Sequence, residues 1–218
     1  MVSMAGMPSI ETMLMFALAG VILVLIPGPS VLFIVGRALA YGRRAALASV
    51  AGNTIGAALV VIFVALGLGA VAAQSAHLFT MLKLVGAAYL VYLGVRTYRE
   101  RGQLADALQV AVPVGAGRNV FRQGVLVGLT NPKALVFYAA VLPQFVDPRT
   151  GSVPVQMAVL GLAFVLIAML LDGLWGLAAG TARNWFAPSP GRLRTLGGTG
   201  GLTMIGLGVG LAVAGRAE

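Results

Sequence analysis

The sequence contains no cysteine. This absence excludes disulfide bonds, thiol relays, cysteine-ligated metal sites and cysteine nucleophiles together. Histidine is almost absent as well, and the single one, His77, cannot form a metal site by itself. We therefore expect neither a metal nor any other cofactor.

Charged residues are also scarce, at 10% of the 218 residues, whereas 59% are hydrophobic. A soluble domain usually has about 25% charged and about 45 to 50% apolar residues. These proportions exclude a water-soluble globular protein and indicate an integral membrane protein. An enzyme is disfavoured, because one histidine, few acids and no cysteine leave little from which to build a catalytic group.

The distribution of positive charge argues against a nucleic-acid partner. The chain has 15 lysines and arginines against 6 acidic residues, a net charge of +9. An excess of this size often indicates a phosphate-rich partner. Here, however, the basic residues lie in short gaps between long apolar runs, which is how a multi-spanning protein orients itself in a lipid bilayer.

Six apolar stretches are long enough to cross a bilayer. Each has about 18 residues or more, which at ~1.5 Å per residue spans a ~30 Å hydrocarbon core. The third stretch holds Lys83 near its start and the sixth is rich in glycine, so five spans with one re-entrant segment are an alternative. We predict an all-α membrane protein with six spans at residues 10–35, 45–73, 78–95, 124–146, 153–182 and 196–214.

The basic residues also predict which side of the membrane faces the cytoplasm. Eleven of the fifteen follow the first span or lie between the third and fourth or the fifth and sixth spans. By the positive-inside rule these connections are cytoplasmic, which places both termini outside if all six stretches span. No basic residue precedes Arg37, so the first stretch is expected to be a retained helix and not a cleaved signal peptide.

The two halves of the chain resemble each other. Residues 20–33 (GVILVLIPGPSVLF) align with residues 124–137 (GVLVGLTNPKALVF) at an offset of 104, and the glycines of the third and sixth stretches recur at an offset of 114. Three spans reverse the direction of the chain, so the halves form an inverted repeat with interrupted helices 1 and 4, a pattern typical of secondary transporters. We predict a first repeat at residues 1–98, a cytoplasmic linker at 99–121 and a second repeat at 122–218.

Proline lies at both predicted helix interruptions. It removes a backbone donor, and the freed carbonyls are tolerated in lipid only when they are buried in protein or face a watery cavity. A packing kink would explain one interruption, but two in equivalent halves favour a substrate site. The candidate site residues are Pro27, Gly28 and Pro29 in the first stretch and Asn131, Pro132 and Lys133 in the fourth.

Two charged residues lie far from the ends of the predicted spans. A lysine at mid-membrane costs roughly 2.5 to 3.5 kcal/mol, so it faces the protein interior or snorkels to the surface. Lys133 lies about 16 Å along a helix from Arg122, which is deep for snorkelling, and we expect it to hold an anionic substrate group or a counter-ion. Asp172 is the only acid well inside a span, and we expect it to carry a proton or bind an ammonium group; a structural pair with Lys133 or Lys83 is the alternative.

Asn53 completes the set of candidates. It lies between Gly52 and Gly56, a spacing of small residues that lets membrane helices approach closely. A packing role is therefore the alternative to a role in the site.

Together these features resemble the LysE/RhtB family of amino-acid exporters. The resemblance covers nearly the whole chain and rests on IPGP at residues 26–29, KLVGAAYL at 83–90, NPK at 131–133 and Asp172. It implies export of amino acids or close derivatives across the bacterial inner membrane, driven by the proton-motive force and often carried out by a homodimer. Related thiol-electron carriers use membrane cysteines, so that branch is excluded.

The candidate residues suit a zwitterionic substrate. Asp172 would accept its ammonium group, while Lys133 and the half-helix N-termini would hold its carboxylate. Competition between proton and substrate for Asp172 would produce exchange. One acid against two lysines in the membrane favours small neutral amino acids over dibasic ones. Export of another small solute, a channel and a structural membrane protein are the alternatives.

Overall fold

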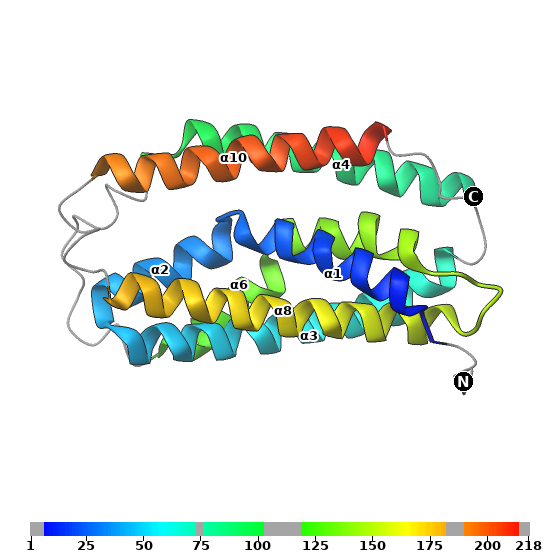
Figure 1. Ribbon diagram of the computed structural model, residues 1–218, viewed down its shortest axis with the longest axis horizontal. Coiled ribbons are helices and arrows are strands. Elements are labelled where there is room, and N and C mark those ends of the chain that lie inside the picture. The colour runs from blue at the N-terminus through cyan, green and yellow to red at the C-terminus, as the bar shows by residue number, and fades with distance from the viewer. Residues whose placement is uncertain (1–6, 73–75, 103–118, 182–189, 214–218) are drawn as a thin grey trace.

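The computed structural model describes residues 7–72, 76–102, 119–181 and 190–213. These residues are almost entirely helical, and the helices run lengthwise through an elongated bundle (Figure 1). Most of the predicted cytoplasmic linker lies outside the described residues. The elements are α1 (Ile10–Leu25), α2 (Pro29–Tyr41), α3 (Arg43–Ala72), α4 (Ala76–Arg99), α6 (Val120–Thr130), α7 (Pro132–Val136), the π-helical turn η2 (Phe137–Val141), the 3-10 turn η3 (Leu142–Phe145), α8 (Val153–Thr181) and α10 (Pro190–Val213).

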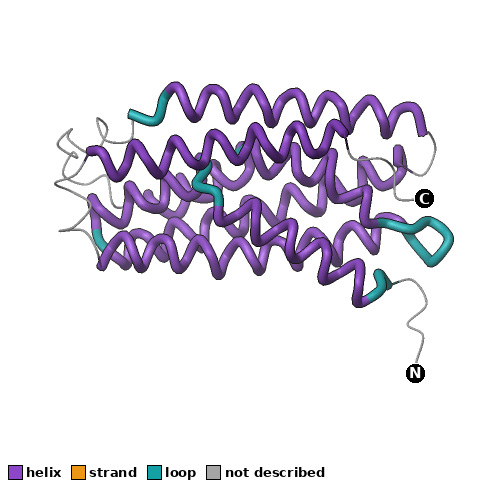
Figure 2. Tube along the Cα trace, turned by 45° about the horizontal axis from the view of Figure 1, so that its top comes forward, coloured by secondary structure: helices purple, strands orange, loops and turns teal. Residues whose placement is uncertain are grey.

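Both interrupted helices occur where the sequence predicts them. α1 and α2 meet at a break of three residues with a bend of 50°, and Figure 2 shows this break as a short loop segment inside the bundle. Asn131 alone separates α6 from α7. Pro29 and Pro132 occupy the first position of the following helix, where the missing N–H of proline removes no intrahelical bond.

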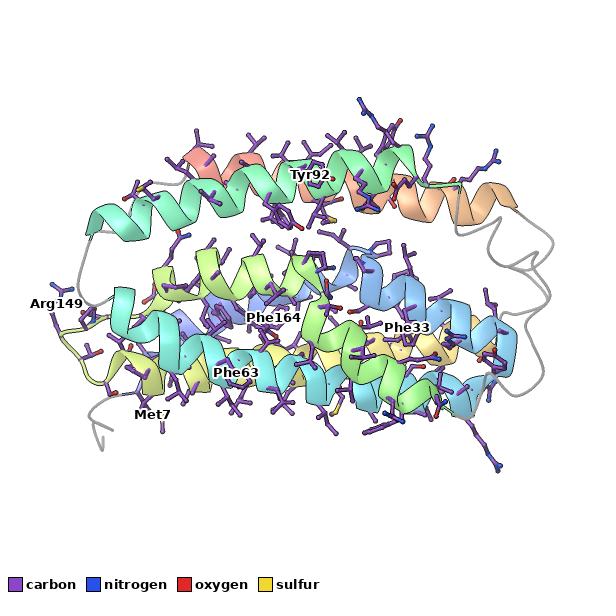
Figure 3. The ribbon with its side chains drawn as sticks, turned by 180° about the vertical axis from the view of Figure 1, so that it is seen from behind. Met7, Phe33, Phe63, Tyr92, Arg149 and Phe164 are labelled. Carbon is purple, nitrogen blue, oxygen red and sulfur yellow. The ribbon has the colours of Figure 1, made fainter. Side chains whose placement is uncertain are left out.

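The two ends of the bundle differ in charge. At one end, the basic end, α3 begins with Arg43, α4 finishes with Arg99 and α6 begins near Arg122. The opposite end, the loop end, contains the connection at residues 146–152, and Figure 3 shows Arg149 there together with Met7. α1 begins and α10 finishes at the loop end (Figure 1).

The helices form two layers. α4 and α10 lie side by side as one layer, and α1, α2, α3, α6 and α8 make up the other (Figure 1). A Cβ atom on Gly94 of α4 would lie 2.6 Å from the carbonyl oxygen of Gly201 of α10, so these two helices touch through their backbones. The buried residues Ile26, Leu90 and Met204 belong to one apolar cluster that joins the layers next to the first helix break.

The outer surface is apolar, as expected for a protein surrounded by lipid. Phe63, which Figure 3 labels, is 71% exposed, and Leu66, Leu126 and Leu174 are similarly exposed. Water-soluble monomers rarely expose apolar side chains in such large contiguous patches.

Three helical segments of the described chain are long and apolar enough to cross a membrane. They are residues 43–67, 120–145 and 153–181, and the bent pair of α1 and α2 is a fourth if it forms one span. α4 and α10, which correspond to the predicted third and sixth spans, are helices of 24 residues but fall outside this group. By length and composition, the described residues thus include three or four spans of a multi-pass membrane protein.

The interior of the larger layer changes in character along its length. Towards the loop end, the rings of Phe16, Phe137, Tyr138, Phe145 and Phe164 pack in edge-to-face and tilted pairs. Towards the basic end, the buried cluster consists of smaller side chains from α2, α3 and α8. The helix breaks lie between these two regions.

Candidate functional site

Five buried polar side chains gather where the two helix breaks meet. Each is no more than 7% exposed, although their positions in the chain range over more than 140 residues. They come from α2, α3, the break before α7, α7 itself and α8. The group, which we call the polar cluster, consists of Ser30, Asn53, Asn131, Lys133 and Asp172.

Hydrogen bonds connect four members of the polar cluster in a row. The Nδ2 of Asn131 donates to Oγ of Ser30 at 2.6 Å, and this hydroxyl donates to Oδ1 of Asn53 at 2.9 Å. Asn53 in turn donates through Nδ2 to Oδ2 of Asp172 at 3.0 Å. The row therefore ends on an oxygen of Asp172, which accepts.

Lys133 reaches across to the other broken helix. Its Nζ donates to the carbonyl oxygens of Leu23 at 3.0 Å and Ile26 at 2.8 Å. The last carbonyls of a helix have no intrahelical partner and carry the negative end of its dipole, so an ammonium group is stabilised there. A Cβ on Gly28 would lie 3.0 Å from Nζ, so glycine at this break makes room for the lysine.

Lys133 and Asp172 form no direct ion pair. In the described part of the chain the ion pairs join Arg96 to Glu100 and Arg149 to Asp147. The structural pair of Asp172 with Lys133, which was the alternative to a direct role, does not form in this structure: Asp172 is bonded to Asn53, and the ammonium group of Lys133 to backbone carbonyls. The side chain of Lys83, the other proposed partner, lies outside the described residues.

A small cavity of about 30 Å³ lies beside the polar cluster. Four of the predicted site residues line it, namely Asn53, Asn131, Lys133 and Asp172, and so do Ser30 and Tyr138. A site needs about 10 to 15 Å³ for one water molecule, so the cavity has room for one or two waters. Any amino acid is larger, and the site must therefore widen to admit one.

The predicted prolines shape the site without lining it. Pro27, Gly28, Pro29 and Pro132 are absent from the cavity wall. Pro29 and Pro132 begin helices, and Asn131 caps the second of these by accepting from the backbone N–H of Lys133 at 3.1 Å. The residues of the two breaks thus end α1 and α6 beside the cavity.

Asn53 lies in a close contact between helices, and its side chain also lines the cavity. A Cβ on Gly52 or Gly56 would overlap a carbonyl oxygen of α6. The backbones of α3 and α6 are therefore in contact, and this contact brings the amide of Asn53 to Ser30 and Asp172.

Two polar residues of the cavity wall, Ser30 and Tyr138, were not predicted from the sequence. Ser30 directly follows Pro29 at the first break, and a polar residue at this position could have been predicted to belong to the site. Tyr138 lies five residues after Lys133 in an otherwise apolar run, and no sequence pattern indicated that its side chain turns inward. Serine and tyrosine are common in helices without any functional role, which is why neither drew attention.

Comparison with known proteins identifies related membrane proteins. The family model described as LysE type translocator matches residues 21–215. An uncharacterized membrane protein of Vibrio cholerae serotype O1 is 37% identical over 94% of this chain and 98% of its own length. A homoserine/homoserine lactone efflux protein of Salmonella typhimurium is 34% identical over 72% of this chain and 74% of its own.

A leucine efflux protein of Salmonella choleraesuis is also similar, at 31% identity over 62% of this chain and 65% of its own. No solved structure matches the chain at a significant level.

Proposed function

Since the chain belongs to the LysE-type translocator family, a family of transporters and not of enzymes, we propose that it exports small amino acids or close derivatives from the cytoplasm in exchange for protons. The observation that carries the proposal is the cavity between the two helix breaks, with an ammonium group on one side and a carboxylate on the other. The names of two relatives, a homoserine/homoserine lactone and a leucine efflux protein, support the substrate class.

The chemistry of the cavity suits a neutral amino acid. The carboxylate of Asp172 would accept hydrogen bonds from the substrate's ammonium group. Lys133 has three N–H donors, two of which donate to backbone carbonyls. Its third donor is available for a carboxylate. A second positive charge on the substrate would find no further acid in the polar cluster, which supports small neutral amino acids as the preferred class.

Proton coupling would arise at Asp172. The same carboxylate cannot bind both a proton and an ammonium group, so protonation from the outside would release the substrate and deprotonation at the cytoplasmic side would let the next one bind.

The wider architecture that we propose is an inverted repeat of six spans, with the basic end in the cytoplasm. The two broken segments, α1–α2 and α6–α7, run in opposite directions along the bundle (Figure 1). α3 packs on α8 and α4 packs on α10, which are the pairings expected between equivalent helices of the two halves. Transporters built in this way place their substrate where the broken helices meet.

The test of function is transport by purified protein in liposomes. Uptake and efflux of a panel of labelled amino acids would be measured with and without an imposed pH gradient, for the native protein and for Asp172→Asn. We expect saturable, gradient-dependent flux of small neutral amino acids and its loss in the variant. Glu11→Gln, which neutralises an exposed carboxylate of α1, is the matched control and should transport normally.

The outcomes separate the alternatives. If Asp172→Asn still exports substrate against a gradient, proton coupling through Asp172 is overturned, but the proposal that the protein is a transporter stands. Flux that does not saturate would indicate a channel, and absence of flux across the whole panel would indicate another small solute or a structural protein.

The proposed topology can be tested in the native sequence background because the chain has no cysteine. Glu100→Cys at the basic end should resist a membrane-impermeant thiol reagent in intact cells, and Arg149→Cys at the loop end should react. The reverse pattern would place the basic end outside. The same two variants, cross-linked in membranes, would report whether the chain forms the homodimer that we expect.

A further inference from the structure

The side chain of Tyr138 carries a buried hydroxyl group that has no hydrogen-bond partner among the described residues. Tyr138 is fully buried, and it lies in the wall of the cavity that also contains Lys133 and Asp172. Leaving a buried polar group without a partner costs about 1 to 3 kcal/mol. A buried polar group without a protein partner requires an explanation, and its place in a cavity wall points to a ligand that it binds.

Tyr138 lies in a π-helical turn of the cavity wall. Leu142 donates its backbone N–H to the carbonyl of Phe137, five residues earlier, so η2 is wider than an α-helix. Here Lys133 and Tyr138 are five apart and line the same cavity. Single π-helical turns of this kind occur frequently at functional sites.

The ring of Tyr138 is held in place by aromatic neighbours. Phe164 packs against it edge-on, with ring centroids 5.3 Å apart and an interplanar angle of 85°. Phe137 packs on it at 6.3 Å and 65°. Figure 3 shows Phe164 within the layer formed by α1, α3, α6 and α8. Because these contacts fix the ring, its hydroxyl cannot turn away to find another partner.

We propose that the Tyr138 hydroxyl donates a hydrogen bond to the carboxylate of the bound substrate, next to the third N–H of Lys133. This rests on the proposed function and names the group that Tyr138 recognises. Both residues offer donors, and Asp172 across the cavity offers an acceptor, so the three groups together match the carboxylate and ammonium of an α-amino acid.

The test compares Tyr138→Phe with the native protein in liposomes. L-homoserine and L-leucine would be the labelled substrates, and 3-methylbutylamine, which is leucine without its carboxyl group, would be a competitor. Tyr138→Phe should raise KM for both amino acids about tenfold and leave inhibition by 3-methylbutylamine unchanged. Tyr89→Phe, on the exposed side of α4, is the matched control and should leave KM unchanged.

A second measurement separates recognition from folding. The lost hydroxyl makes no hydrogen bond in the empty protein, so the melting temperature of Tyr138→Phe without substrate should equal or exceed that of the native protein. A melting temperature lowered by several degrees would show a structural partner and overturn the proposal.

The kinetic outcomes are equally distinct. If the native protein transports these amino acids and Tyr138→Phe has an unchanged KM, the role of Tyr138 is overturned and the proposed function stands. Inhibition by 3-methylbutylamine that is weakened as much as the binding of leucine would show that the hydroxyl recognises some group other than the carboxylate, and would overturn the proposal. Native protein that transports no amino acid would overturn the proposed function, and this inference with it.

Discussion

The crossing of α6 over α3 and the crossing of α1 over α8 are built in different ways. In the first, glycines bring the two backbones into contact: a Cβ on Gly52 would overlap the carbonyl oxygen of Phe121, and a Cβ on Gly124 would lie 2.5 Å from that of Ser49. In the second, the nearest neighbour of Gly20 is a ring atom of Phe164, 2.9 Å from the position of a Cβ.

This difference bears on which helix can move. A contact between backbones can change only if a whole helix shifts, whereas a contact with a side chain can adjust by rotation of that side chain. We therefore expect α3 and α6 to move as one unit, and α1 to move relative to α8 when the cavity widens for substrate. Four predictions test this contrast.

The largest effect is expected from Gly56→Ala in the α3–α6 crossing. The added Cβ would overlap the carbonyl oxygen of Val125, so the two helices must separate. We expect a loss of about 3 kcal/mol of stability, at the upper end of the range for overpacking. The measurement is the melting temperature of the purified protein in detergent.

Gly67→Ala on the same helix is the control for this variant. Nothing lies within 4 Å of its added Cβ, and alanine has a higher helix propensity than glycine by up to about 1 kcal/mol. Its melting temperature should stay equal or rise. If both variants melted alike, the backbone contact would not be what holds the crossing together.

Ser30→Ala tests the hydrogen bonds that connect the two crossings. Removing this hydroxyl leaves Nδ2 of Asn131 and Oδ1 of Asn53 without their partners in a buried site. We expect a loss of about 2 kcal/mol in a denaturation experiment. Ser49→Ala is the control, because the hydroxyl of Ser49 bonds to the carbonyl of Ala45 within the same helix and should matter much less.

Gly20→Ala in the α1–α8 crossing should cost about 1 kcal/mol or less. The ring of Phe164 has to shift, and the gain in helix propensity offsets part of that cost. In the double variant with Phe164→Leu, the smaller side chain leaves room for the new methyl group. The melting temperatures of the single and double variants show whether the effects of the two substitutions depend on each other. Strictly additive effects would contradict a direct contact between residues 20 and 164.

Much of the architecture was predictable because lipid restricts what a sequence can contain. Long apolar runs, prolines inside two of them and a few intramembrane charges are rare features, and they led to the helices, both breaks and the grouping of Asn53, Lys133 and Asp172. The partners were not predictable. Lys133 binds the carbonyl of Leu23, 110 residues earlier, and every residue offers an identical carbonyl.

The position of Tyr138 was unpredictable for a related reason. Whether a turn is α-helical or π-helical depends on how the helix packs on its neighbours, and the apolar residues of η2 would suit either form. The sequence analysis indicated that Gly52 and Gly56 allow a close approach, but it could not tell that α6 is the helix that approaches.

The smallest effect concerns the connection at the loop end. Arg149 donates to the Asp147 carboxylate from its side chain and from its backbone N–H, which lowers the pKa of Asp147 below its ordinary value. A lowered pKa contributes stability above the unfolded value of about 3.9. That contribution is lost as the pH falls through the folded value.

Arg149→Gln removes the side-chain donors and keeps the backbone bond. Its melting temperature should therefore decline slightly less than that of the native protein between about pH 5 and pH 3. Because the connection is exposed and lies away from both helix crossings, the difference should be small and transport near neutral pH should be unchanged. A large change in transport would mean that the connection at the loop end moves together with α1. The part of the protein that moves relative to α3 and α6 would then include this surface connection.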